Sequence, residues 1–101
     1  MRALAAIVAL CLSTSALAAE LDVHVRAGLC ATLIAKRPDS DKEVDLVLRH
    51  APNVMLALEH GGRWMDEMDA NKNRPQVQRR LIDDARRACA TFGVATTASD
   101  R

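Results

Sequence analysis

Aromatic residues are scarce in this chain, which has one Trp, one Phe and no Tyr among its 101 residues. It also lacks any long stretch in which apolar and polar residues alternate, the pattern of a half-buried β-strand. Ala, Leu and Arg are abundant, and all three favour helix. These features exclude a β-sheet protein and predict an all-α fold.

An apolar run long enough to span a bilayer is absent as well. The longest run, residues 3–12, follows a positive charge at Arg2, whereas a transmembrane helix needs about 20 apolar residues. Ala16 and Ala18 then form the small-x-small pattern that signal peptidase accepts. We predict that residues 1–18 are a secretory signal peptide and that the mature protein is soluble and periplasmic, with secretion further out as the alternative.

No excess of one charge sign remains after this cleavage. Of the 14 Lys and Arg residues only Arg2 is removed, which leaves 13 basic and 13 acidic residues in the mature chain. Nucleic-acid-binding domains carry a basic surface, so this balance argues against a nucleic-acid partner.

The charges are nevertheless unevenly distributed. Residues 39–48 and 59–69 each hold four acidic residues and one basic residue, whereas residues 72–87 hold six basic and two acidic residues. These segments predict either docking surfaces for a partner or helix faces of opposite charge that pack side by side within the chain.

Cysteine is sparse and widely spaced. Cys11 is removed with the signal peptide, and Cys30 and Cys89 remain. Neither has a second cysteine or a histidine at the short spacing of a metal site, so we predict no metal and no cofactor. Two cysteines in a small exported domain predict a disulfide, which at a separation of 59 residues stabilises the fold by about 4 kcal/mol.

The first half of the mature chain shows two helical patterns. Apolar residues at four-residue spacing predict a first helix over residues 21–35. Ser40 and Glu43 form a capping box, which predicts the start of a second helix. Pro52 interrupts that helix, and the unbroken apolar phase favours one kinked helix reaching His60 over two short helices.

In the second half, Gly61-Gly62 predicts the end of that kinked helix, and a short helix follows around Trp64. A last helix begins with Pro75 in its first turn and ends at Gly93.

Together these patterns predict a single helical domain over residues 19–95 and a flexible C-terminal tail over residues 96–101. The domain is a small four-helix bundle in which one disulfide joins the first and last helices.

One cluster has the composition of a protein-binding surface. It consists of Arg63, Trp64, Met65 and Met68, and Trp, Arg and Met are enriched where protein partners bind. The alternative is that Trp64 and Met68 fill the core of the bundle.

The sequence offers no catalytic motif. Asp66, Glu67 and Asp69 supply carboxylates, but no Ser or Cys nucleophile stands in a recognisable turn with a base. We predict that the chain is not an enzyme, and a small hydrolase is the least favoured function.

In layout the chain resembles two kinds of small exported helical protein, the immunity proteins of bacterial toxin systems and the acid-stress chaperones of the periplasm. We predict a protein-binding module that acts by stoichiometric binding, as an inhibitor, an immunity protein or an assembly factor. The alternative is an acid-activated periplasmic chaperone, in which protonation of 13 carboxylates and three histidines opens the bundle.

Overall fold

The computed structural model describes residues 22–97 and residue 100. Within them the chain forms four helices and no strand: a first helix over residues 22–34, α2 (Asp41–Leu48), α3 (Val54–Ala70) and α4 (Pro75–Thr91). The predicted all-α fold is confirmed. The predicted signal peptide, residues 1–18, lies outside the described residues.

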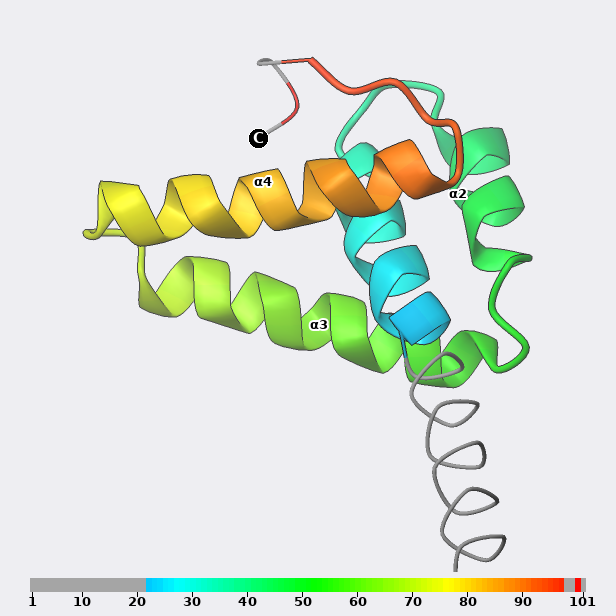
Figure 1. Ribbon diagram of the computed structural model, residues 1–101, viewed down its shortest axis with the longest axis horizontal. Coiled ribbons are helices and arrows are strands. Elements are labelled where there is room, and N and C mark those ends of the chain that lie inside the picture. The colour runs from blue at the N-terminus through cyan, green and yellow to red at the C-terminus, as the bar shows by residue number, and fades with distance from the viewer. Residues whose placement is uncertain (1–21, 98–99, 101) are drawn as a thin grey trace, which may run out of the picture.

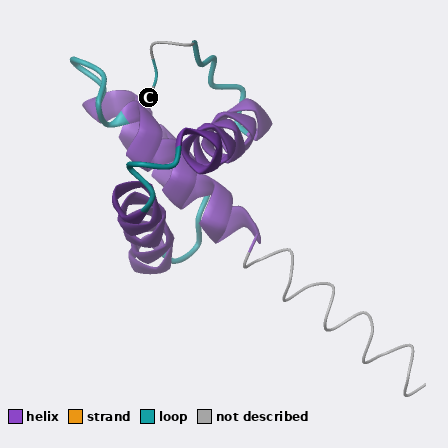
Figure 2. Cartoon of the chain, turned by 90° about the vertical axis from the view of Figure 1, so that its left-hand side faces the viewer, coloured by secondary structure: helices purple, strands orange, loops and turns teal. Residues whose placement is uncertain are grey.

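α3 and α4 form an antiparallel hairpin joined by a short turn (Figure 1). The first helix crosses this hairpin near the end that holds the start of α3 and the end of α4, and α2 lies beside the first helix. Figure 2 shows the same crossing from the side, with the first helix running diagonally across the hairpin. None of the described helices combines the length and the apolar content needed to cross a membrane.

The predicted disulfide joins Cys30 of the first helix to Cys89 of α4, with the two Cα atoms 4.8 Å apart. Both cysteines are fully buried. Around them lies a single hydrophobic core built from small and aliphatic residues together with one tryptophan. Its members are Ala27, Cys30, Ala31, Leu33, Ile34, Val47, Ala51, Ala57, Trp64, Leu81, Ala85, Ala88 and Cys89.

The first helix crosses α3 at two glycines, Gly28 and Gly61. A Cβ atom on Gly28 would overlap the carbonyl oxygen of Ala57, and one on Gly61 would overlap the Thr32 hydroxyl and lie 2.9 Å from the Gly28 carbonyl oxygen. The backbones of the first helix and α3 can approach this closely only because glycine has no Cβ atom. The crossing therefore depends on both residues.

This contact explains why the predicted helix end at Gly61-Gly62 is wrong. α3 continues through both glycines to Ala70, so the predicted separate helix around Trp64 is the second half of α3. The cost of two glycines in a helix interior is about 1 kcal/mol each, which tertiary packing can offset. The Gly28–Gly61 contact is such packing.

The predicted kinked helix through Pro52 is also wrong. α2 ends at Leu48, and α3 begins at Val54 after a non-helical segment. Asn53 caps α3, because its side-chain oxygen accepts the Leu56 N–H at 3.2 Å. The Asn53 N–H in turn donates to His24 Nε2 at 3.0 Å. This cap and the missing N–H of proline outweigh the continuous apolar phase.

α2 begins where the sequence predicts, but its capping box does not form. The Ser40 side chain makes no cap hydrogen bond to α2, and its hydroxyl lies 3.4 Å from the Ala35 carbonyl oxygen instead. Glu43 pairs with Arg37 rather than with the backbone of Ser40. The boundary is therefore right and its predicted mechanism is wrong.

Candidate interaction surface

Trp64 is a core residue, the second of the two alternatives that the sequence left open. Its side chain is 4% exposed, and its indole N–H donates to the Leu81 carbonyl oxygen at 2.9 Å. The Lys36 ammonium lies 5.6 Å from the centre of the Trp64 ring. Trp64 therefore joins α3 to α4 and faces away from solvent.

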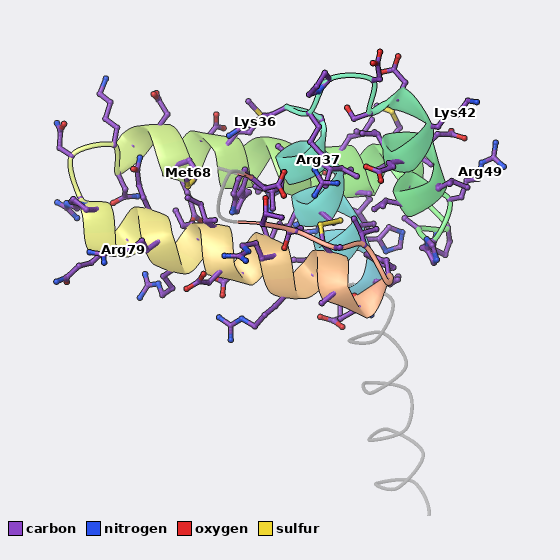
Figure 3. The ribbon with its side chains drawn as sticks, turned by 90° about the horizontal axis from the view of Figure 1, so that it is seen from above. Lys36, Arg37, Lys42, Arg49, Met68 and Arg79 are labelled. Atoms are coloured by element: carbon purple, nitrogen blue, oxygen red, sulfur yellow. A yellow bond between two sulfur atoms is a disulfide. The ribbon has the colours of Figure 1, made fainter. Side chains whose placement is uncertain are left out.

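The other members of the predicted cluster do not share one surface. Arg63 and Met65 are exposed, and Arg63 pairs with Glu59 at 2.9 Å. Met68 is half-buried between α3 and α4, where its carbonyl oxygen accepts from the Gln78 side chain at 3.1 Å (Figure 3). Neighbours in the sequence point in directions 100° apart on a helix, which separates Met65 from Trp64.

A different apolar surface runs along the outer side of α3. It consists of Met55, Leu58, Gly62 and Met65, which we call the outer seam. The three large side chains are 74%, 48% and 53% exposed, and Gly62 is exposed with open space around it. Most large exposed apolar residues of the described chain lie on α3. Besides the three of the outer seam, Val54 at the start of α3 is 43% exposed, whereas Leu46 lies on α2.

α3 thus carries two apolar stripes. The inner stripe, Ala57, Gly61 and Trp64, is buried against the first helix and α4. The outer seam follows spacings of three, four and three residues, so its members lie along one side of the helix. A surface helix of a globular domain needs only the inner stripe to be stable. The three large side chains of the outer seam are not buried against any other part of the described chain.

Acidic residues flank the outer seam. Glu59 and Asp66 each follow a large apolar member of the seam by one residue, and Asp69, seven residues after Gly62, ends the apolar run of the seam. All three are exposed. Asp66 and Asp69 make no ion pair with other described residues, so their charges face solvent.

The C-terminal tail is held by an ion pair that the sequence did not predict. Arg37 donates to both carboxylate oxygens of Asp100, at 2.7 and 2.8 Å, and also to the carbonyl oxygen of Ala95. The Asp100 carboxylate accepts the Thr97 N–H at 2.8 Å as well. Figure 3 shows Arg37 at the end of the first helix beside the tail. We call this contact the tail latch.

The latch changes the acidity of its carboxyl group. The hydrogen bond from Arg37, followed by that from the Thr97 backbone, lowers the pKa of Asp100 to about 2. The bond to Asp100 raises the pKa of Arg37 above its ordinary value. The local sequence carries no signal for this pair, because its members lie 63 residues apart.

A shallow hollow of about 460 Å³ lies between α3 and α4, next to the tail. Its lining includes Met68, Pro75, Arg79, Ile82 and Asp83. The carboxylates considered for catalysis, Asp66, Glu67 and Asp69, stand on the exposed side of α3 and do not line this hollow. Residues 22–97 and 100 hold no cluster of three or more His, Cys, Asp or Glu residues that would bind a metal ion.

Two of the histidines have structural contacts. His24 is buried and accepts from the backbone of Asn53, and His50 bonds to the Leu46 carbonyl oxygen with its ring 4.6 Å from that of Phe92. The outer seam is therefore the feature of the described surface that needs a functional explanation.

Comparisons with known proteins add no assignment. No protein-family model matches the chain, and neither a curated protein nor a solved structure shows significant similarity to it.

Proposed function

We propose that the chain is an exported protein-binding module that acts by stoichiometric contact, as an inhibitor, an immunity protein or an assembly factor. The observation that carries the proposal is the outer seam, where Met55, Leu58 and Met65 remain about half exposed or more in the folded state. Contiguous exposed apolar side chains mark interaction sites more often than isolated ones do.

The chemistry around the seam favours a protein over other partners. Glu59, Asp66 and Asp69 would be repelled by the phosphates of a nucleic acid or of an anionic membrane. A protein surface offers apolar side chains for the seam and polar groups for its rim. The buried Cys30–Cys89 disulfide supports the exported part of the proposal, because disulfides persist in oxidising compartments.

The acid-activated chaperone is the second candidate, and the tail latch favours it. The latch is an acid-sensitive contact, since it requires the Asp100 carboxylate to stay ionised. The low pKa of that carboxyl group keeps the latch intact until strongly acidic pH. A stoichiometric binder needs no such opening, because the seam is already exposed at neutral pH. Binding at pH 7 therefore separates the two functions.

The test compares two serine substitutions in the oxidised mature chain. Leu58→Ser removes a side chain of the seam that is 48% exposed, and Leu46→Ser removes one on α2 that is 58% exposed. Each protein is immobilised and exposed to periplasmic extract of the bacterium that encodes the chain, and the captured protein is then purified and its stoichiometry measured. Circular dichroism first establishes that both variants are folded.

We expect one protein to be captured in a 1:1 complex by the wild type and by Leu46→Ser, and to be lost with Leu58→Ser. Equal capture by both variants would show that the seam is not the binding surface. If nothing is captured at pH 7 but unfolded client proteins are kept soluble near pH 2, the pKa of the Asp100 carboxyl group, the chaperone function replaces this proposal.

A further inference from the structure

We infer that the outer seam binds an amphipathic helix of another protein, one whose apolar face is flanked by Lys or Arg. The inference rests on the proposed function and adds the chemistry of the partner. It draws on the spacing of the seam, the glycine at its centre and the charges beside it.

The spacing of the seam matches a helical partner. Met55, Leu58, Gly62 and Met65 follow one another at three, four and three residues, which are the a and d positions of two heptads. Side chains at these positions interdigitate with those of a second helix packed alongside. An extended strand would find no row of free backbone groups on α3 to pair with. The seam therefore suits a helix of about two heptads.

Gly62 provides the point of closest approach. A Cβ atom placed on Gly62 would meet nothing within 4 Å, whereas one on Gly61 would collide with the first helix. The two adjacent glycines thus lie on different stripes of α3, Gly61 on the inner stripe and Gly62 on the outer seam. Gly61 admits the first helix of this chain, and Gly62 leaves the same kind of depression open on the outer seam. A large side chain of the partner fits into that depression.

The flanking charges specify a basic partner. Glu59 and Asp66 occupy the e positions of the two heptads, where residues beside a helix–helix seam form salt bridges that set partner choice. Arg63 already pairs with Glu59 at 2.9 Å, while Asp66 has no ion pair among the described residues. Lys or Arg opposite these positions would pair with them, and Asp or Glu would be repelled.

The same charges argue against a second copy of this chain. Two antiparallel α3 helices would place Glu59 and Asp66 of one copy opposite those of the other. A parallel pair would need the g positions, Gly61 and Met68, which are turned toward the chain's own core. The exposed side of α4 is basic at Arg79 and Arg87 but offers no large exposed apolar side chain to fill the seam.

The test uses three synthetic 21-residue peptides as probes. The first carries Leu at a and d and Lys at e and g. The second has Glu in place of every Lys, and the third has the composition of the first with its Leu positions scrambled. Binding to the oxidised mature chain is measured by fluorescence anisotropy at low and at physiological salt.

We expect the Lys peptide to bind. The Glu peptide should bind roughly fivefold more weakly than the Lys peptide, because two flanking pairs change from attraction to repulsion. The scrambled peptide should not bind. Leu58→Ser should lower affinity for the Lys peptide, and Leu46→Ser should not.

A charge reversal gives the decisive comparison. Asp66→Lys should largely abolish the preference, because the substituted position then favours the Glu peptide while Glu59 still favours the Lys peptide. Glu67→Lys makes the same change in net charge one residue away, at a position off the seam, and should leave the preference as it is in the wild type.

Two outcomes would overturn the inference. If Glu67→Lys shifts the preference as much as Asp66→Lys does, the peptides respond to net charge and no seam is involved. If Leu58→Ser abolishes capture of the cellular partner but no peptide shows a charge preference, the proposed function stands and the basic-helix partner is wrong. Failure of both experiments rejects both proposals.

Discussion

Gly28 and Gly61 lie backbone to backbone where the first helix crosses α3, with no room for a Cβ atom on either residue. This contact sets the position of the hairpin against the first helix and so brings Cys30 near Cys89. A glycine pair that would ordinarily end a helix instead lies within α3, and its two members have different neighbours.

The two glycines of α3 should therefore respond to alanine in opposite directions. Gly61→Ala forces a Cβ into the crossing and should destabilise the fold by about 1–3 kcal/mol, the usual cost of overpacking. Gly62→Ala fills open space in an exposed helix and should stabilise it by about 0.5–1 kcal/mol. Urea unfolding with the disulfide intact measures both changes, and equal effects of the two substitutions would contradict the close crossing of the first helix and α3 at Gly61.

The tail latch should make stability depend on pH below about 4. The pKa of Asp100 is about 2 in the folded chain, against an ordinary value of 3.8, so the unfolded state binds this proton first. The stabilisation is present above pH 4 and is lost as the pH falls toward 2. Because the Arg37 side chain is 24% exposed, solvent screening reduces the gain to roughly 1–2 kcal/mol.

Asp100→Asn is the matched variant for this effect. It should lower the free energy of unfolding at pH 6 by that amount and flatten its slope between pH 4 and pH 2. Thermal melts at several pH values measure both quantities. An unchanged slope would mean that the latch does not contribute to stability in solution.

Reduction of the disulfide should be strongly destabilising. Cys30 and Cys89 close a loop of 59 residues, which corresponds to about 4 kcal/mol of chain entropy. Dithiothreitol, or the double variant Cys30→Ser with Cys89→Ser, should lower the midpoint of thermal unfolding by tens of degrees at this domain size. A reduced protein with the melting temperature of the oxidised one would show that the helices hold together without the bond.

Trp64 should behave as a core residue. Trp64→Ala should cost about 3–5 kcal/mol, because it leaves a cavity between α3 and α4. Trp64→Phe keeps most of the volume but leaves the Leu81 carbonyl oxygen without the indole N–H, and should cost about 1–3 kcal/mol. Chemical denaturation measures both. If Trp64→Ala is as stable as the wild type, the ring is not buried in solution.

Periodicity and spacing were sufficient for the helical class, the disulfide partners and the start of α2, since each depends on local pattern or on a single possible pairing. They were insufficient at Gly61 and Pro52. At Gly61 a contact with Gly28, which lies in another helix, overrides the local signal. At Pro52 the cap from Asn53 and the bond to His24 fix the chain in a non-helical path.

The interaction surface was only partly predictable. Residues 63–68 have the composition of a protein-binding surface. In the folded chain, however, Trp64 is buried in the core and Met65 is exposed to solvent. The heptad spacing of Met55, Leu58, Gly62 and Met65 is present in the sequence. It could be distinguished from the core stripe only after the positions of the first helix and α4 were known.

The span of the contacts has a consequence for the order in which the chain folds. Trp64 and Leu81 are 17 residues apart, so the α3–α4 hairpin can form as soon as its own sequence is available. The disulfide and the tail latch join residues 59 and 63 positions apart. Closing such long loops costs more entropy and must wait for the second partner. The latch needs Asp100, so it can form only after the residues of all four described helices have been synthesised.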